Sequence, residues 1–204
     1  MTGSANAATS FFDSELSSSR TMVILRGYPP EETVRLCARA ESMAVRLVEV
    51  PAQTPAALES LAAAVAWAEG REVTIGAGTV TTPEILGAVH RTGARFTVAP
   101  GVDANVSRAS VDLGVPHLPG VATATEVTSA LALGHVWLKV FPASVLGAAW
   151  IPALKGPFPD AKFVATGGIT PQNAHHFLDA GADAVSLGGS FADADPSQVQ
   201  SLRR

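Results

Sequence analysis

The chain has 204 residues, of which 47% are apolar and 16% are charged, and its formal net charge is -4. This composition is typical of a single globular domain with a sizeable core. The mildly acidic balance and the lack of any Lys/Arg run argue against a nucleic-acid partner, because nucleic-acid binding needs a basic face.

Residues 1–20 are polar and rich in Ser and Ala, with Phe11 and Phe12 as their aromatic pair. They lack the apolar segment of a secretory signal, and no apolar run in the chain reaches the roughly 18 residues of a membrane span. We therefore expect residues 1–20 to form a segment with a short helix ahead of a domain in 21–204, with no membrane partner. The single cysteine, Cys37, can form no intrachain disulfide, which fits a reducing cytoplasm.

From Met22 onward, short apolar or β-branched runs alternate with longer stretches of helical periodicity. The predicted strands are 22–26, 45–50, 73–76, 95–99, 115–119, 136–140, 162–166 and 184–187. The predicted helices are 30–42, 55–68, 82–92, 104–113, 123–133, 148–154 and 171–180, with a closing helix after Pro196. Strands that alternate with helices in this way indicate βαβ units and a parallel sheet.

Eight strands with eight helices predict a single-domain α/β fold, the (β/α)8 TIM barrel, with a short N-terminal helix. A doubly wound open sheet is the structural alternative. Its dinucleotide fingerprint is missing, because the first strand ends in Leu25-Arg26-Gly27-Tyr28-Pro29 rather than in a Gly-rich turn that opens a helix.

In a TIM barrel the site lies at the carboxyl ends of the strands, and Lys139 is the strongest candidate there. It is one of only three lysines and lies inside an apolar run, Val136-Trp137-Leu138-Lys139-Val140-Phe141. Period-two alternation directs it into the barrel if the aliphatic residues face the helices. Apolar surroundings disfavour an ammonium, and the free amine is the form that attacks a carbonyl. The alternative is a structural ion pair with a buried carboxylate.

Glu49, near the end of the second predicted strand, is the natural partner of Lys139. Its carboxylate would act either as a structural ion pair for the lysine or as a general acid/base. Schiff-base chemistry needs the second role, because each of its steps moves a proton.

Paired glycines follow the last two predicted strands, in Thr166-Gly167-Gly168 and in Gly188-Gly189-Ser190. Exposed backbone N–H groups at these two places commonly bind phosphate in barrels, although tight turns would also need glycine. Arg26 and the turn Gly76-Ala77-Gly78-Thr79 complete the ring of strand ends and are candidates for holding a carboxylate. Pro100 also lies at a strand end. For Arg26 the alternative is an ion pair, and for the glycines a tight strand exit.

An ordered set of motifs resembles the KDPG/KHG aldolase family, that is, 2-keto-3-deoxy-6-phosphogluconate and 4-hydroxy-2-oxoglutarate aldolases. The resemblance runs from about Thr21 to Phe191. Its motifs are Leu47-Val48-Glu49-Val50, Ile75-Gly76-Ala77-Gly78-Thr79-Val80, Leu118-Pro119-Gly120, Leu138-Lys139-Val140-Phe141-Pro142-Ala143, Lys155-Gly156-Pro157-Phe158-Pro159 and Thr166-Gly167-Gly168-Ile169.

This resemblance implies a class I, metal-independent pyruvate aldolase that needs no cofactor and is usually a homotrimer. Lys139 resembles the Schiff-base lysine and Glu49 the acid/base. By the same resemblance Phe141 would pack near the pyruvyl group, and Thr79 and the preceding glycines would lie near its carboxylate. The distal phosphate would be held by Gly167, Gly168, Gly189 and Ser190.

The segment Glu49-Val50-Pro51-Ala52-Gln53-Thr54 departs from the family pattern, in which many members have an arginine four residues after the glutamate. Gln53 stands at that place, so we expect Arg26 to take over its anion-binding role. Three segments resemble the branch that acts on the galactonate epimer, 2-dehydro-3-deoxy-6-phosphogalactonate: Ile24-Leu25-Arg26-Gly27, Glu49-Val50-Pro51 and 121–126.

The sequence thus predicts a lyase that splits a 2-keto-3-deoxy-6-phospho-sugar acid into pyruvate and glyceraldehyde 3-phosphate. Two rivals stay open. A phosphate-binding barrel isomerase or decarboxylase could use the same glycines, but it would not require the apolar setting of Lys139. A non-catalytic sugar-phosphate binder could keep the same fold, since fold alone does not fix function.

Overall fold

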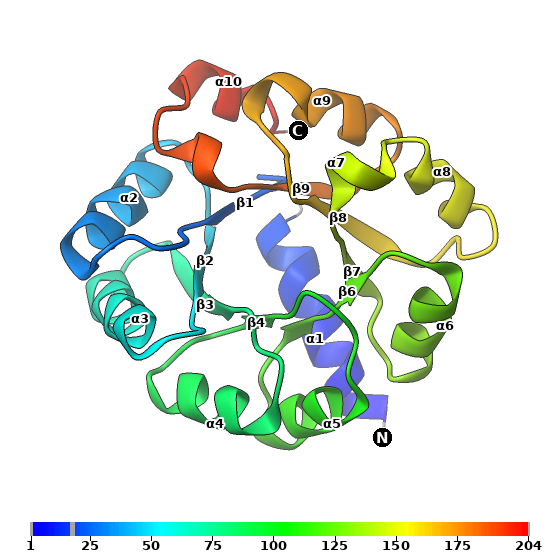
Figure 1. Ribbon diagram of the computed structural model, residues 1–204, viewed down its shortest axis with the longest axis horizontal. Helices are drawn as coiled ribbons and strands as arrows, with labels where there is room; N and C mark the ends of the chain where they lie inside the picture. The colour runs from blue at the N-terminus through cyan, green and yellow to red at the C-terminus, as the bar shows by residue number, and fades with distance from the viewer. Residues whose placement is uncertain (1, 17–18, 204) are drawn as a thin grey trace.

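Residues 2–16 and 19–203 are described by the computed structural model of the chain. Parallel strands form a central ring, and helices surround it (Figure 1). The strands are β1 (Thr21–Ile24), β2 (Leu47–Pro51), β3 (Thr74–Gly78), β4 (Thr97–Val98), β5 (His117–Leu118), β6 (Gly120–Val121), β7 (Trp137–Val140), β8 (Lys162–Thr166) and β9 (Ala184–Leu187). Their order in the sheet is β5-β4-β3-β2-β1-β9-β8-β7-β6. The predicted TIM barrel is therefore confirmed.

The ring closes through Pro119, which joins β5 to β6. β5 pairs with β4 and β6 pairs with β7, so the two ends of the sheet are consecutive in the chain. The sequence predicts one strand over 115–119, whereas the structure divides this strand position in two. Proline has no N–H to donate to the ladder and so interrupts it.

Helices on the outside match most of the predicted ranges. They are α2 (Pro30–Ser42), α3 (Pro55–Ala68), α4 (Pro83–Arg91), α5 (Ala104–Leu113), α6 (Ala124–Ala132), α7 (Ala143–Leu146), α8 (Trp150–Lys155), α9 (Pro171–Asp179) and α10 (Pro196–Gln200), with a 3-10 turn, η1 (Gly189–Phe191). Threonine N-caps begin α3, α4, α6 and α9, and their side chains accept a backbone N–H from the first turn. The sequence did not predict α7. Within the described residues, no helix has the length and apolar character needed to cross a bilayer.

Inward-facing side chains fill the barrel in layers. In an eight-stranded barrel with a shear of 8, each layer takes one residue from each of four alternate strands. The strand registers give a first layer of Leu47, Phe96, Trp137 and Ala184, and a second of Met22, Gly76, Leu118 and Val164. The third layer, toward the carboxyl ends of the strands, contains Glu49, Val98, Lys139 and Ser186. The barrel interior is therefore apolar in the first two layers, whereas the third layer holds three polar side chains.

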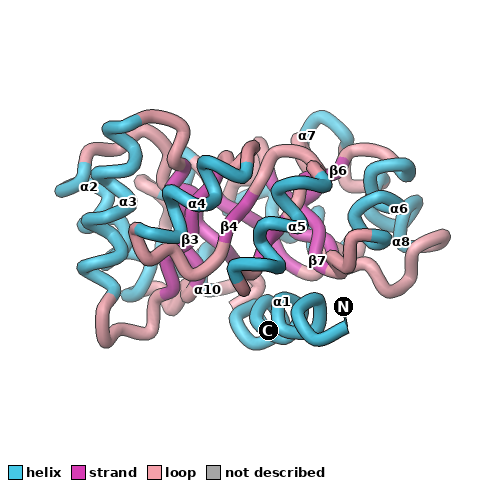
Figure 2. Tube along the Cα trace, turned by 90° about the horizontal axis from the view of Figure 1, so that it is seen from below, coloured by secondary structure: helices cyan, strands magenta, loops and turns pink. Residues whose placement is uncertain are grey.

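An additional helix, α1 (Thr2–Leu16), lies across the end of the barrel where the strands begin, whereas α7 lies at the opposite end (Figure 2). Phe12 and Leu16 are fully buried against the first layer. The Phe12 ring lies 6.0 Å from that of Phe96 and 6.3 Å from that of Trp137, measured between centroids. The expected N-terminal segment, residues 1–20, contains this helix; its positions 1, 17 and 18, and position 204 of the barrel segment, lie outside the described residues.

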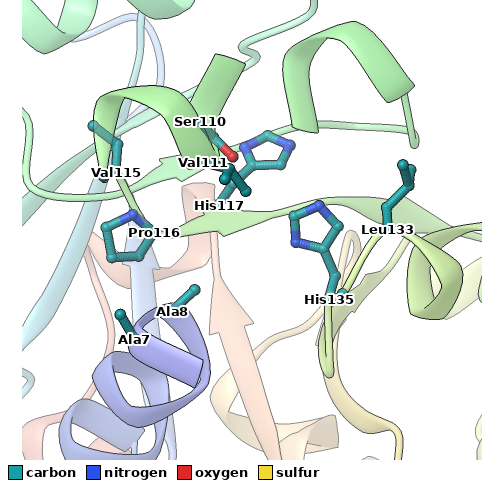
Figure 3. A pocket seen from close by; sticks show the side chains of 11 residues that line it. Ala7, Ala8, Ser110, Val111, Val115, Pro116, His117, Leu133 and His135 are labelled. Atoms are coloured by element: carbon teal, nitrogen blue, oxygen red, sulfur yellow. The ribbon is translucent and has the colours of Figure 1, made fainter. Parts of the chain in front are cut away.

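Two buried histidines lie at the same end of the barrel, beside a small cavity that Ala7 and Ala8 of α1 also line (Figure 3). His117 Nδ1 is 2.9 Å from Thr97 Oγ1, and His135 Nε2 is 2.9 Å from Ser107 Oγ. The two rings pack edge to face, 5.6 Å apart between centroids. Burial lowers the pKa of His117 to about 3, with a further contribution from His135, and burial lowers that of His135 to about 4. Both rings are therefore neutral parts of the core.

Candidate active site

A cavity of about 440 Å³ opens at the end of the barrel where the strands finish. Eight of the predicted site residues line it: Arg26, Lys139, Phe141, Thr166, Gly167, Gly168, Gly189 and Ser190. The last two strands and the loops after them supply most of these residues. The cavity thus lies where barrels of this type hold their sites.

Lys139 is 4% exposed, and its side chain reaches the cavity from the third layer. The other two lysines are paired, Lys155 with Asp183 at 2.8 Å and Lys162 with Asp13. Lys139, in contrast, forms no ion pair with any carboxylate of the described residues. Its Nζ lies 5.0 Å from the centroid of the Phe141 ring. The amine is therefore desolvated on most sides and remains available on the cavity side.

Glu49 lies in the same layer as Lys139 and is fully buried. Neither carboxylate oxygen accepts a hydrogen bond from another described group. A buried and unpaired carboxylate is costly, so a structural ion pair does not explain why the chain keeps it. Gly78 lies directly beside this side chain, because a Cβ built at Gly78 would be 1.9 Å from Glu49 Oε1. Glycine at position 78 therefore makes room for the carboxylate.

Arg26 lies at the rim of the cavity, where its guanidinium donates a 3.2 Å hydrogen bond to Thr79 Oγ1. Thr79 has a φ of +61°, which is rare for a residue with a branched Cβ. These two predicted carboxylate-binding residues therefore come together, although only Arg26 lines the cavity. Gln53, at the place of the family arginine, is exposed.

The glycines after β8 and β9 form one wall of the cavity. Gly167 and Gly168 have φ values of +94° and +71°, which other residues rarely adopt. A Cβ on Gly168 would also overlap Ser144 Oγ of α7. From the next loop, Ser190 donates a 3.2 Å hydrogen bond to the carbonyl of Ile169, which ties the two loops together.

Four predicted residues do not line the cavity: Glu49, Gly78, Thr79 and Pro100. Thr79 contacts the lining residue Arg26, Glu49 lies in the layer of the lining residue Lys139, and Gly78 lies against Glu49. The Pro100 carbonyl lies beside Gly120. Gly188, of the predicted glycine pair, also lines the cavity, and the sequence interpretation missed four lining residues: Ile24, Ile169, Thr170 and Ser186. Period-two counting along the last strand back from Gly188 could have found Ser186.

The described residues contain no group of three or more His, Cys, Asp or Glu side chains that could hold a metal ion. The chemistry at hand is an amine that can add to a carbonyl, a carboxylate that can accept and return protons, and a glycine wall of the kind that holds anions. Fold and cavity together are those of a barrel enzyme that acts on small carbonyl compounds.

Comparison with known proteins assigns the family. The family model for KDPG and KHG aldolase matches residues 12–203. The chain is 38% identical over 177 residues to the 2-dehydro-3-deoxy-6-phosphogalactonate aldolase of Escherichia coli (strain K12), covering 86% of each chain. It is 37% identical over 180 residues to the 2-dehydro-3-deoxy-phosphogluconate aldolase of Treponema pallidum (strain Nichols), covering 84% of each.

A solved structure shows the same fold with a captured reaction intermediate. The KDPG aldolase of Legionella pneumophila, with pyruvate captured as a covalent carbinolamine, superimposes with a TM-score of 0.78 at 27% identity, covering 98% of this chain and 96% of that chain. This chain therefore belongs to the KDPG and KHG aldolase family, and it is a lyase of the aldolase type.

Proposed function

We propose that this chain is a class I aldolase that cleaves a 2-keto-3-deoxy-6-phospho-sugar acid into pyruvate and glyceraldehyde 3-phosphate. This proposal rests on the buried Lys139 amine, which has no ion-pair partner and lines a cavity at the open end of the barrel. Glu49, whose carboxylate has no hydrogen-bond partner, lies in the same layer. The relatives named as phosphogalactonate and phosphogluconate aldolases support the substrate class. No cofactor enters the proposal, because the lysine adduct itself serves as electron sink.

In the proposed reaction the Lys139 amine adds to C2 of the keto acid and forms a carbinolamine. Glu49 in its acid form protonates the departing hydroxyl, water leaves, and an iminium remains. The Glu49 carboxylate then removes the proton of the C4 hydroxyl, and the C3–C4 bond breaks. The aldehyde leaves, the bond's electrons form an enamine, and Glu49 returns the proton to C3. Hydrolysis of the new iminium frees pyruvate and the amine.

Substrate orientation follows from the two walls of the cavity. We place the carboxylate of the keto acid toward Arg26, Thr79 and the turn that contains Gly78, near Pro100, because the guanidinium is the rim cation on that side. Phe141 would pack against the pyruvyl group. Thr166 and the glycine wall would take the far end of the substrate, with the phosphate on N–H groups of Gly167, Gly168 and Gly189 and on the Ser190 hydroxyl.

Borohydride trapping tests this proposal. Incubation of the protein with pyruvate and sodium borohydride should reduce the iminium and attach a reduced pyruvyl group to Lys139, located by peptide mass spectrometry. Lys139→Ala should abolish the adduct, whereas Lys162→Ala, which removes a paired lysine near α1, should keep it. Absence of an adduct in the unmodified chain, or an adduct in the Lys139→Ala variant, would refute the mechanism.

Pyruvate release coupled to lactate dehydrogenase gives the substrate preference, measured side by side on the gluconate and galactonate epimers and on 4-hydroxy-2-oxoglutarate. Turnover of none of the three would favour a non-catalytic sugar-phosphate binder. We also propose that the chain forms a cytoplasmic homotrimer, which the resemblance to its family supports. Light scattering after size-exclusion chromatography tests the trimer. The division into an N-terminal segment, 1–20, and a barrel, 21–204, is likewise a proposal, which limited proteolysis tests.

A further inference from the structure

Ser186, the third residue of β9, has a hydroxyl that nothing in the fold explains. The residue is 1% exposed, and its Oγ has no hydrogen-bond partner among the described groups. It lines the same cavity as Lys139. Several other buried hydroxyls are satisfied, such as that of Ser107 by His135 and that of Ser60 by the carbonyl of Tyr28.

An unpaired buried hydroxyl destabilises the folded state relative to one that is hydrogen-bonded. Alanine at position 186 would avoid this cost. The same strand already has an inward-facing alanine, Ala184, two residues earlier. Among the described residues, Thr21 Oγ1 is the other buried hydroxyl without a partner. Thr21 pairs with Val185 and faces the outer helices, so its hydroxyl lies outside the barrel interior. Ser186 is therefore the unpaired hydroxyl that points into the cavity.

The register places Ser186 in the layer of Lys139 and Glu49. Around the ring the strands run β7, β8, β9, β1, β2, and the layer takes its residues from β7, β9 and β2 in turn. Ser186 thus lies at the same height as the amine and the carboxylate, on the arc of the wall between them. The Ser186 hydroxyl therefore borders, on this side, a substrate that is bound to Lys139 and exchanges protons with Glu49.

We propose that Ser186 is a further catalytic residue, whose hydroxyl donates a hydrogen bond to the oxygen on C2 of the keto acid. In the ground state this oxygen is the carbonyl that Lys139 attacks. As the C–N bond forms, the C=O π electrons move onto that oxygen, and it takes up the proton that the nitrogen gives up, which completes the carbinolamine hydroxyl. The C2–O bond then breaks, the oxygen leaves as water with the proton from Glu49, and the nitrogen lone pair forms the C=N bond.

Ser186 keeps its own proton throughout these steps. It holds the oxygen in place and stabilises the negative charge that develops on it during attack. The inference rests on the proposed function, because it assigns a contact to the Lys139 adduct. The Ser186 hydrogen bond affects adduct formation and dehydration, and both of these steps occur with pyruvate alone.

The test compares Ser186→Ala and Ser186→Cys with Thr21→Val, which removes the other unpaired buried hydroxyl. The rate of borohydride-trappable adduct formation with pyruvate should fall about 100- to 1000-fold in Ser186→Ala, as expected for loss of one donor to a developing oxyanion. Ser186→Cys, which keeps a weak donor, should fall between Ser186→Ala and the unmodified chain. Thr21→Val should keep the unmodified rate. KM for the sugar acid should change far less than kcat, because the contact strengthens during the reaction.

Each outcome supports or overturns a stated step. An unmodified rate in Ser186→Ala overturns the inference, as does a loss of similar size in Thr21→Val, which would indicate a general effect of core hydroxyls. If Ser186→Ala does not fold, as judged by circular dichroism, Ser186→Cys decides: a rate equal to that of the unmodified chain overturns the inference. If the unmodified chain itself forms no adduct, the proposed function fails, and this result is distinct from the others.

Discussion

Acidification should destabilise the barrel from the end opposite its cavity, through His117 and His135. Burial lowers the pKa of these rings from 6.5 to about 3 and about 4. Because folding lowers the pKa of both rings, the unfolded chain binds protons at a higher pH than the folded chain does. Acidification therefore favours unfolding. The stabilising contribution is therefore complete above pH 6.5 and is lost as the pH falls from there toward the folded-state values.

At pH 5 both rings are still neutral in the folded state, whereas both are protonated in the unfolded state. The difference of one and a half pH units from the ordinary value corresponds to about 2 kcal/mol for each ring, or about 4 kcal/mol for the pair. The two losses add in this range because neither folded ring carries a charge that would act on the other. Urea titrations followed by circular dichroism at pH 7.5, 6 and 5 measure the free energy of unfolding directly.

A double variant separates the two histidines from the carboxylates that also titrate. Asparagine at His117 can keep a partner for Thr97, and glutamine at His135 can keep one for Ser107. The chain should lose about 4 kcal/mol more between pH 7.5 and pH 5 than this double variant loses. His90→Gln, at an exposed histidine, should keep the pH dependence of the unmodified chain. Parallel losses in the chain and the double variant would refute the reasoning.

Three further variants or measurements test other contacts. Gly78→Ala should displace the Glu49 carboxylate and lower kcat for pyruvate release about 10- to 100-fold, whereas Gly101→Ala, where an added Cβ meets nothing within 4 Å, should not. Phe12→Ala should cost about 3–5 kcal/mol of unfolding free energy by opening a cavity under α1, measured by urea denaturation. Burial raises the pKa of Cys37 to about 12, so iodoacetamide should label this thiol only after unfolding; rapid labelling of the native chain would contradict its burial.

Much of this fold could be predicted from local patterns. Period-two alternation in Trp137-Leu138-Lys139-Val140 predicts an inward lysine, and the structure has Lys139 in the third layer. The helices expected over 55–68 and 82–92 begin at Pro55 and Pro83 in the structure, so the N-termini of α3 and α4 agree to within a residue. These features succeed because each depends on neighbours within one turn or one strand.

Features that depend on distant partners could not be predicted in this way. The layer that joins Glu49, Lys139 and Ser186 follows from the shear of the closed barrel, which no single strand encodes. The same limit applies to Gly78, whose role is to make room for a side chain on β2. α7 escaped prediction because its four residues, Ala143–Leu146, are too few to show a helical period.

Helix α1 covers the end of the barrel opposite the cavity. Phe12 and Leu16 are buried in one cluster with Leu47, Phe96 and Trp137, so the described side chains close this end. Substrate must therefore reach Lys139, and products must leave, through the cavity at the other end of the barrel. In the proposed reaction the aldehyde fragment therefore leaves first by this route, while the three-carbon remainder stays bound to Lys139 until water enters by the same route.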